Sequence, residues 1–201
     1  MATNPKREWV SVEEYMELDQ VSSVRYEYWE GQLVAMSGGT GDHALIATNI
    51  IAALRHQVKA PCRLYNSDLK VQIASDKFLL PDIHITCDPA DLIGKIQAAR
   101  SPKLIFEVLS PTTERADRGR KFFSYQRLAS MQEYVLVNYQ QQLVEVYRRE
   151  NRKWSYEIYE ANEIVELVSL SLTLSVNAIY EDTSIPVNTP LDMFDDEEIQ
   201  D

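Results

Sequence analysis

An acidic residue lies inside an apolar stretch of the chain and limits how that stretch can fold. Glu107 is preceded by Leu104-Ile105-Phe106 and followed by Val108-Leu109. A short apolar run of this kind predicts a buried central strand of a sheet. An unpaired carboxylate there would cost several kcal/mol, so something must compensate it. The compensation is either a buried ion pair with an arginine or lysine, or a role as a metal ligand or catalytic acid.

The chain is long enough to form one globular domain. It has 201 residues, of which 45% are hydrophobic and 25% charged, and a core of this size needs neither a metal nor a disulfide to fold. We expect one domain over residues 1–185 and an acidic, disordered tail over residues 186–201, because the last ten residues hold six acids and no base. Cys62 and Cys87 form no CxxC pair, which disfavours a structural zinc site or a secreted disulfide scaffold.

No segment is expected to enter a membrane. The longest run without a charged residue, 167–180, has 14 residues, whereas a transmembrane helix needs about 20 apolar ones. The first residues, MATNPKREWV, lack the apolar region of a signal peptide. We therefore expect a cytoplasmic protein without membrane partners.

The charge of the chain is unevenly distributed. The formal net charge is −11, which by itself argues against nucleic acid, because binding there depends on neutralising phosphates. Between residues 100 and 127, however, seven basic residues stand against three acidic ones, a balance of +4. The basic residues are Arg100, Lys103, Arg115, Arg118, Arg120, Lys121 and Arg127. We expect this segment to form a basic face to which DNA binds.

The hydrophobic pattern predicts a mixed α/β domain. Ser11 and Glu14 form a capping box that begins a short helix to about residue 18. Ala47, Ile50 and Leu54 lie on one face of a second helix that ends near residue 59. A third helix is expected over 114–128. Two short strands joined by a turn at Glu30-Gly31 are expected within 24–36. Further strands are expected over 62–73, 79–87, 103–109 and 133–137, and as a hairpin over 142–149 and 153–159.

A second carboxylate precedes the strand that comes before Glu107. Pro81-Asp82 opens the segment Asp82-Ile83-His84-Ile85-Thr86. Two carboxylates at the ends of adjacent strands can hold a hard divalent cation such as Mg²⁺, with water and a substrate phosphate completing the octahedron. The alternative is that Asp82 only caps a Pro-Asp turn.

These residues stand in an order that resembles a known family. Pro81-Asp82 is followed by Phe106-Glu107-Val108-Leu109-Ser110-Pro111-Thr112-Thr113, then by Asp117-Arg118-Gly119-Arg120-Lys121 and Tyr125. Further matching positions are Glu13-Glu14-Tyr15, Tyr26-Glu27, Gly31, His43, Ser67-Asp68-Leu69 and Glu133-Tyr134-Val135-Leu136-Val137. The chain resembles the Uma family of restriction-endonuclease-like proteins, which belongs to the PD-(D/E)XK nuclease superfamily.

The resemblance implies both a fold and an activity. The fold is a restriction-endonuclease-like mixed sheet flanked by helices, here with an added C-terminal β-hairpin. The activity is that of a metal-dependent endonuclease that hydrolyses phosphodiester bonds in DNA, with Asp82 and Glu107 binding Mg²⁺ or Mn²⁺. A homodimer is one arrangement that double-strand cleavage by this fold would use. The target and the choice between DNA and RNA stay open.

The superfamily also implies a lysine two residues after the acid, and here the sequence departs from the pattern. That position is Leu109, which faces the same side of the strand as Glu107 but cannot activate water. The resemblance implies that Lys121 replaces it from the following helix, held by Asp117 and Tyr125, which share its stripe at i−4 and i+4. The alternative is an ordinary Asp117–Lys121 pair worth only ~0.3–0.5 kcal/mol. Lys70, on the polar face of its predicted strand, is a second candidate.

Two further residues are candidates for supporting roles. His43 begins the second helix on its inward face, where some related nucleases have an additional metal ligand; the alternative is a hydrogen-bonded core histidine. Glu27 matches an acid that lies near the site in the family, although Arg25, Lys6 or Arg7 could pair with it instead. The aromatic residues around Tyr125 fit core packing better than a stacking platform for single strands.

Three functions are compatible with these residues. The first is the metal-dependent DNA endonuclease, with Asp82, Glu107 and Lys121 as its catalytic residues. The second is a catalytically degenerate nuclease fold that serves as a nucleic-acid-binding or interaction module, which Leu109 and the negative net charge support. The third is a hydrolase that uses Asp82 and Glu107 as an acid and base without metal. Metal dependence separates the first from the third.

Overall fold

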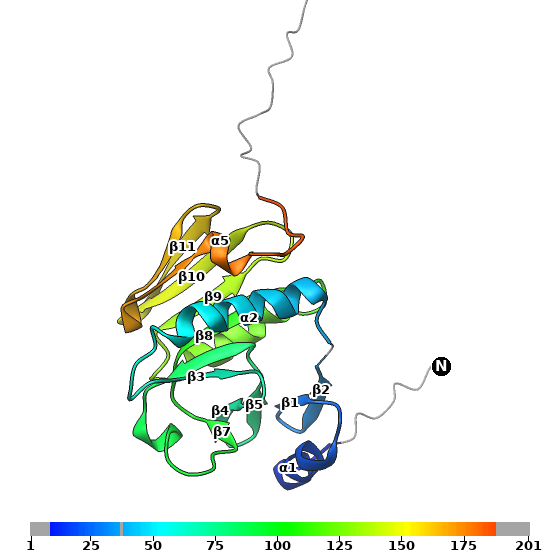
Figure 1. Ribbon diagram of the computed structural model, residues 1–201. Helices are drawn as coiled ribbons and strands as arrows, with labels where there is room; N and C mark the ends of the chain where they lie inside the picture. Colours follow the sequence, from blue (N-terminus) through cyan, green and yellow to red (C-terminus); the bar gives the residue numbers. More distant parts are fainter. Residues whose placement is uncertain (1–8, 37, 188–201) are drawn as a thin grey trace, which may run out of the picture.

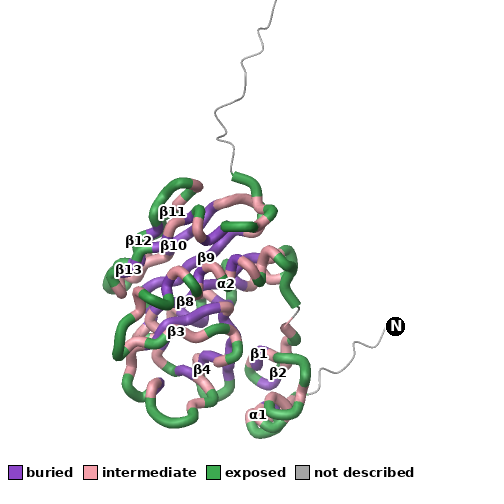
Figure 2. Tube along the Cα trace, in the orientation of Figure 1, coloured by how far each residue is buried: buried purple, intermediate pink, exposed green. Residues whose placement is uncertain are grey.

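A mixed six-stranded sheet forms the centre of the domain in the computed structural model, which describes residues 9–36 and 38–187. The strand order is β11-β10-β9-β8-β6-β3 (Figure 1). The strands are β3 (Arg63–Asn66), β6 (Ile83–Thr86), β8 (Pro102–Val108), β9 (Glu133–Val137), β10 (Leu143–Glu150) and β11 (Lys153–Glu160). Neighbours are antiparallel except β8 and β9, which run parallel. These two central strands are buried along almost their whole length (Figure 2).

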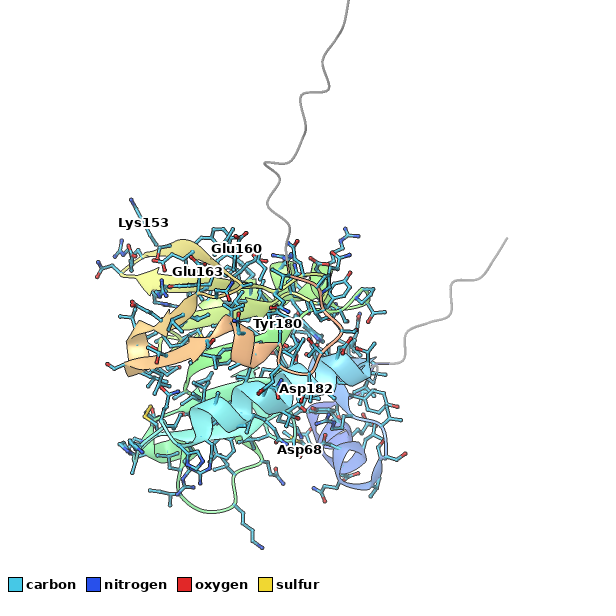
Figure 3. All side chains as sticks on the ribbon, turned by 45° about the horizontal axis from the view of Figure 1, so that its top comes forward. Asp68, Lys153, Glu160, Glu163, Tyr180 and Asp182 are labelled. Carbon is cyan, nitrogen blue, oxygen red and sulfur yellow. A yellow bond between two sulfur atoms is a disulfide. The ribbon has the colours of Figure 1, made fainter. Side chains whose placement is uncertain are left out.

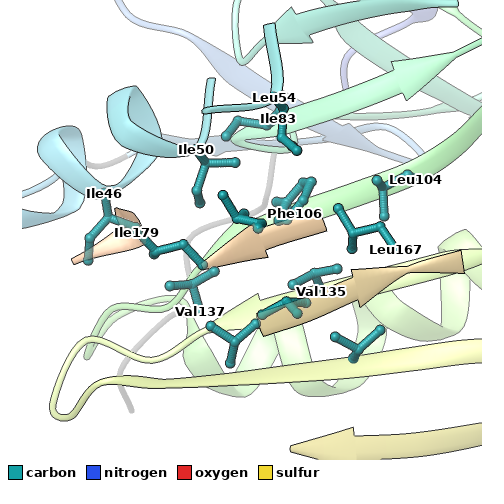
Figure 4. Close-up of a cluster of buried hydrophobic side chains, with 14 of the residues drawn as sticks. Ile46, Ile50, Leu54, Ile83, Leu104, Phe106, Val135, Val137, Leu167 and Ile179 are labelled. Atoms are coloured by element: carbon teal, nitrogen blue, oxygen red, sulfur yellow. The ribbon is translucent and has the colours of Figure 1, made fainter. Parts of the chain in front are cut away.

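One face of this sheet carries the larger apolar core. It is covered by α2 (Gly41–Arg55), by the short hairpin of β12 (Ile164–Leu167) and β13 (Leu172–Ser175), and by α5 (Val176–Ile179). The helix α2 contributes Ile46, Ile50 and Leu54, which meet Phe106 and Val135 of the sheet (Figure 4). Alternation along β8 places every second side chain in this core and the others, including Glu107, on the opposite face.

A second sheet and a helical segment pack on the opposite face. The second sheet has the order β2-β1-β5-β4-β7. Its strands are β1 (Tyr26–Trp29), β2 (Gln32–Ala35), β4 (Lys70–Ala74), β5 (Lys77–Leu79) and β7 (Ala98–Ala99). The helix α1 (Val12–Val21) packs Tyr15 against Tyr28 and Phe78 of this sheet. The site residues therefore lie between two sheets rather than on the edge of one.

The predicted third helix is present but is not regular. It consists of α3 (Glu114–Ala116), a π-helical turn over Asp117–Lys121, and α4 (Phe122–Gln126). Tyr125 of α4 packs in an apolar cluster with Ile105, Leu109 and Leu136 from the central sheet. π turns inside α-helices occur frequently at functional sites, and here the turn contains both Asp117 and Lys121.

Several sequence predictions are confirmed. Ser11 caps α1 in a complete capping box with Glu14. The turn at Glu30 and Gly31 joins β1 to β2, with both residues at positive φ. The predicted C-terminal hairpin is β10–β11. The helices α1 and α2 end at Val21 and Arg55, a few residues from the predicted ends.

Two predicted strands are wrong because each is divided between the two sheets. The segment 62–73 contains β3 of the central sheet and β4 of the second, separated by a turn at residues 67–69. The segment 79–87 divides at Pro81-Asp82 into the end of β5 and all of β6. Lys70 is consequently not on a polar face: it is buried, forms an ion pair with Asp19 and lies 5.3 Å from the ring centroid of Tyr15.

The two cysteines are bonded to each other, which their spacing in the sequence did not predict. Cys62 and Cys87 form a disulfide that links the residue before β3 to the residue after β6. Sequence spacing held no sign of this pair, because the two residues meet only through the pairing of β3 with β6.

The membrane prediction and the tail are tested only in part. None of the helices in the described ranges is long and apolar enough to cross a bilayer. The acidic tail predicted over 186–201 falls outside the described residues from position 188 onward.

Candidate active site

Glu107 is buried and makes its contacts with the helical segment that follows its strand. Only 2% of its surface is exposed. Its Oε1 lies 2.7 Å from Nζ of Lys121 and accepts a hydrogen bond of 3.0 Å from the Tyr125 hydroxyl. Burial raises the pKa of the Glu107 carboxyl well above its usual range; Lys121 opposes this rise, and Asp117 and Asp82 add to it. The compensating base required by the sequence is therefore Lys121.

Asp82 lies beside Glu107 across the strand pair. Ile83 pairs with Phe106 in the β6–β8 register, so Asp82 and Glu107 occupy the next position on each strand. The backbone N–H of Val108 donates to Asp82 Oδ2 at 2.7 Å, and His43 Nε2 lies 3.5 Å from the same oxygen. The contacts hold the Asp82 side chain at the end of its strand, close to Glu107.

Lys121 is surrounded by three carboxylates. Besides Glu107, its Nζ lies 2.9 Å from Asp117 Oδ1 and 3.4 Å from Glu27 Oε1. The approach to Asp117 is an ion-pair contact without hydrogen-bond geometry. Burial alone would lower the pKa of Lys121, but the charges of Glu107 and Glu27 raise it well above its usual range. Lys121 is therefore an ammonium group whose charge the surrounding carboxylates stabilise in a buried position.

Glu27 reaches the site from the second sheet. It lies on β1, is buried, and accepts hydrogen bonds from Trp29 Nε1 at 3.0 Å and from the backbone of Leu80 at 3.3 Å. Trp29 in turn carries the guanidinium of Arg120 over its ring at 4.5 Å. Glu27 does not pair with Arg25, which forms an ion pair with Asp68 instead.

The π turn is anchored to the central sheet. The hydroxyl of Tyr134, on β9, donates to the backbone carbonyl of Asp117 at 3.0 Å. Tyr134 also contacts Tyr125, and together these tyrosines fix the two ends of the segment that presents Lys121. Leu109 is fully buried beside Tyr125 and Ile105, so the position two residues after Glu107 lies inside the apolar core. Lys121 is the lysine that reaches Glu107.

The candidate residues line one cleft of about 310 Å³. Its wall includes Glu27, His43, Asp82, Glu107, Asp117, Arg120 and Lys121. A hydrogen bond to Asp82 raises the pKa of His43, although burial opposes the rise. A Cβ added to Gly39 would lie 2.7 Å from His43 Nδ1, so only glycine lets the loop pass this close to the imidazole. Four carboxylates thus line the cleft together with two basic side chains, Arg120 and Lys121, and one histidine.

Asp82 and Glu107 have the chemistry to hold a divalent metal. One oxygen of each carboxylate, Asp82 Oδ1 and Glu107 Oε2, has no hydrogen-bond donor among residues 9–36 and 38–187. Carboxylate oxygens suit Mg²⁺ and Mn²⁺, and Mg²⁺ is often bound by only one or two carboxylates plus water and phosphate. Within the described part of the chain, no three acidic, histidine or cysteine side chains converge on one metal position. The fit is to a two-carboxylate site.

The structure separates the predicted site residues into two groups. It brings together Asp82, Glu107, Lys121, Asp117, Tyr125, Glu27 and His43. It places Lys70 elsewhere, in its pair with Asp19. The predicted basic face is also partly wrong, because Arg118 is committed to Glu145, at 2.6 and 2.7 Å, and Lys121 is buried.

Sequence reasoning missed two contributors to the site. Trp29 binds Glu27 and supports Arg120, and Tyr134 holds the π turn. A signal for Trp29 was present, since it lies two residues after Glu27 and therefore on the same face of a strand. Nothing in the sequence marked the hydroxyl of Tyr134, because its partner is a backbone carbonyl.

A mixed sheet with a carboxylate cleft between strand ends and a helix defines a restriction-endonuclease-like domain, and comparison with known proteins agrees. Residues 12–180 match the profile of the Uma2 family, described as "Putative restriction endonuclease". The chain belongs to this family.

Individual proteins extend the comparison. The chain is 35% identical to the uncharacterized protein slr1290 of Synechocystis over 85% of its length and 91% of that protein. It is 26% identical to sll1609 of the same organism, over 70% of the chain and 82% of that protein. It is similar in fold to a crystal structure from Anabaena variabilis described as "a putative nuclease belonging to DUF820". That likeness has a TM-score of 0.64 and 19% identity, and covers 85% of this chain and 97% of the other. The predicted fold class and family are confirmed.

Proposed function

We propose that this protein is a metal-dependent endonuclease that hydrolyses phosphodiester bonds in DNA. The observation that carries the proposal is the ion cluster in the cleft, where Lys121 touches Glu107 at 2.7 Å beside Asp82. Both acids keep an oxygen without a donor among the described residues. An excess of carboxylates around a cleft attracts cations and repels a bare phosphate, so a metal ion would be needed before a phosphodiester could enter. The Uma2 family description supports the nuclease class.

The proposal gives each residue a distinct task. Asp82 and Glu107 would hold Mg²⁺ or Mn²⁺, which when bound lowers the pKa of a water molecule and neutralises charge on the phosphate. Lys121 supplies a fixed positive charge at the Glu107 end of the cleft, where it can orient water or stabilise negative charge on a phosphate oxygen. Asp117, Glu27 and Tyr125 position Lys121 and Glu107, since each contacts one of them directly.

Lys121 takes the place of the lysine that the superfamily has on the strand. The period-two rule puts residue 109 on the side of Glu107, yet that side is already filled by the apolar cluster around Leu109. An ammonium at position 109 would have to be buried among apolar side chains, which is costly. The helix after β8 instead brings Lys121 to the carboxylate from the cleft side.

One observation favours the second candidate, a fold that binds nucleic acid without cutting it. All three carboxylates around Lys121 already contact its ammonium. If the ammonium is fully used in this way, the cluster is a structural ion network and the protein acts as a binding module. Cleavage assays separate the two candidates.

The test combines metal binding with cleavage. We expect calorimetry to detect Mn²⁺ binding to the wild type and to lose it in Asp82→Asn and Glu107→Gln, while Asp76→Asn, an exposed acid outside the cleft, binds as the wild type does. Plasmid DNA is expected to be cut with Mg²⁺ or Mn²⁺ and not with EDTA. Lys121→Met should keep Mn²⁺ binding and lower the cleavage rate at least about 100-fold.

Each alternative has its own outcome. Cleavage that persists in EDTA would support acid–base hydrolysis by the two carboxylates without metal. DNA binding without cleavage in any metal would support the binding module. RNA cut in preference to DNA would correct the substrate. The homodimer and the cytoplasmic location stay predictions.

A further inference from the structure

The cleft continues into a second depression along the helix α2. This depression, of about 500 Å³, shares Met36, Gly38, Gly39, His43 and Asp82 with the wall of the cleft. Its remaining lining comes mainly from α2 and from the end of β3. These residues include Ala44, Ala47, Thr48, Ile51, Asn66 and Ser67. Asp82 and His43 therefore mark the junction of two connected spaces rather than the end of one.

A third depression lies at the other end of the same two elements. It measures about 510 Å³ and is lined by residues from the end of α2, from β3 and from the connection between them. These residues are Arg55, Val58, Ala60, Pro61, Cys62, Arg63, Leu64 and Tyr65, together with Leu92. The helix α2 and the edge strand β3 lie side by side (Figure 1). The second and third depressions thus follow one another along the same helix and strand, with Ile51 and Asn66 lining one and Arg55 and Tyr65 lining the other. We call the path along them, from the cleft to Arg55 and Arg63, the track.

Helical geometry aligns the side chains of this track. Positions 44, 48, 51 and 55 fall on one stripe of α2, spaced by three or four residues. The stripe begins with small side chains, Ala44 and Thr48, and ends at Arg55. His43 and Arg55 are 12 residues apart, about 18 Å along the helix axis. Small residues near the cleft leave room for a polymer backbone, and the arginine stands where that backbone would leave.

The two arginines at the end of the track have no partner in the described part of the chain. Both Arg55 and Arg63 are exposed, and neither forms an ion pair or side-chain hydrogen bond with residues 9–36 or 38–187. No acidic side chain of these ranges lines their depression. By contrast, Arg118 and Arg148 are both held by glutamates. On a protein with a net charge of −11, two unpaired guanidiniums in one hollow form a local anion site.

Nearby charges do not cancel this site. Lys59 donates to the carbonyl of His56 at the end of α2 and serves that helix end. Asp68, at the turn after β3, is bound by Arg25 at 2.9 Å. Asp68, which follows the lining residue Ser67, is therefore already neutralised by an arginine that itself lines the track.

We propose that the groove between α2 and β3 is the path of the DNA backbone, and that Arg55 and Arg63 bind a phosphate distant from the one that is cut. At about 18 Å from His43, the contact is more than one nucleotide away from the cleft, since a B-form strand rises only about 3.4 Å per nucleotide along its axis. Guanidinium groups bind phosphate oxygens in a forked geometry without reading bases. The inference rests on the proposed function, since it assigns the scissile phosphate to the Asp82–Glu107 cleft.

The experiment measures binding apart from cleavage. Fluorescence anisotropy of a labelled 20-base-pair DNA duplex is recorded in EDTA, over a range of salt concentrations, for the wild type and for Arg55→Ala/Arg63→Ala. The matched control is Arg152→Ala/Lys153→Ala, two exposed basic residues at the β10–β11 turn, where Lys153 projects away from α2 (Figure 3). Circular dichroism checks that all three proteins are folded.

The expected result is specific to the track. Loss of two phosphate contacts lowers the slope of log affinity against log salt by about 1.8, at about 0.9 per contact, and weakens binding at least about tenfold at low salt. The control should bind within about twofold of the wild type. In plasmid cleavage the arginine variant should raise KM with kcat nearly unchanged, since the contact is far from the scissile bond.

The two proposals fail in different ways. A wild type that cuts DNA, with an arginine variant that keeps its salt slope and KM, would overturn the track and leave the proposed function in place. Equal losses of DNA affinity in the arginine variant and the control would show that only the net charge matters. This result would also contradict the proposed DNA path. A wild type that neither binds nor cuts DNA would overturn both.

Discussion

Glu107 and Glu133 are buried acids on neighbouring parallel strands, yet their surroundings differ. Glu133 is 1% exposed and accepts from Arg148 Nε, the backbone N–H groups of Val168 and Ser169, each at 3.0 Å, and the Ser169 hydroxyl. Both of its oxygens are occupied. Glu107 is 2% exposed, but its described contacts converge on Oε1 alone.

The difference distinguishes an acid used for folding from an acid available for binding. The contacts of Glu133 attach the loop between β12 and β13 to the central sheet and complete its hydrogen-bonding capacity. Glu107 shares one cation, Lys121, with two other carboxylates, and its Oε2 stays available to accept a ligand in the cleft. A buried carboxylate alone is therefore not a functional signal; an incompletely paired one beside a cleft is.

The largest effect is expected at the completed site. Glu133→Ala removes the buried partner of Arg148 and leaves two partly buried N–H groups without an acceptor, so the free energy of unfolding should fall by about 3–5 kcal/mol. Urea denaturation followed by circular dichroism measures it. A loss below about 1 kcal/mol would show that Glu157 is a sufficient partner for Arg148, and would contradict the assignment of Glu133 as an acid used for folding.

A buried histidine with no partner extends the comparison. His84 is fully buried on β6, neither ring nitrogen has a hydrogen bond in the described ranges, and burial lowers its pKa from 6.5 to about 3. The unfolded chain therefore takes up this proton at higher pH than the folded protein. The stability contributed by neutral His84 is complete above pH 6.5 and is lost as the pH falls, at about 1.4 kcal/mol per unit.

The measurement is the pH dependence of unfolding between pH 6.5 and 4.5. The wild type should lose about 2 kcal/mol more than His84→Phe over this range, because phenylalanine can keep the stacking on Tyr65 and has no proton to gain. Parallel pH profiles for the two proteins would mean that His84 finds a partner once it is charged.

The smallest effect has the opposite sign. The pKa of Glu107 is raised in the folded protein, so its contribution to stability is complete below the unfolded value of 4.5 and is lost as the pH rises. At pH 7 without metal, the free energy of unfolding of Glu107→Gln should therefore equal that of the wild type or exceed it by about 1 kcal/mol. Thermal unfolding at pH 7 and pH 4.5 tests this prediction. A clear loss of stability at pH 7 would show that Glu107, like Glu133, serves to stabilise the fold.

The sequence supports prediction of the site better than of the surrounding sheets. Glu107 stands out because a charge in an apolar strand needs a reason, and the helix after it places Lys121 within reach. Alternation along 62–73 shows two faces but not which of them is covered, so it places Lys70 on a polar face, whereas Asp19 and Tyr15 of α1 cover this lysine. The disulfide and the arginine pairs depend on chain segments that meet only after folding.

Local charge sums also mislead for a physical reason. The +4 between residues 100 and 127 counts Arg118 and Lys121 as surface charges, whereas Arg118 pairs with Glu145 outside that window and Lys121 is buried among carboxylates. The sequence gives no sign that Arg55 and Arg63 form a pair, because they belong to different elements. Only the packing of α2 beside β3 makes them neighbours.

The position of Glu27 in the second sheet has a consequence for the order in which the site becomes complete during synthesis. The ribosome makes Glu27 first, Asp82 and Glu107 later, and Lys121 last of these four. A growing or truncated chain that stops just before Lys121 has these carboxylates, and that of Asp117, but no ammonium to hold them together, and mutual repulsion then keeps the acids apart. The cleft is therefore assembled only after both sheets and the helical segment exist, so a fragment or nascent chain does not carry this constellation.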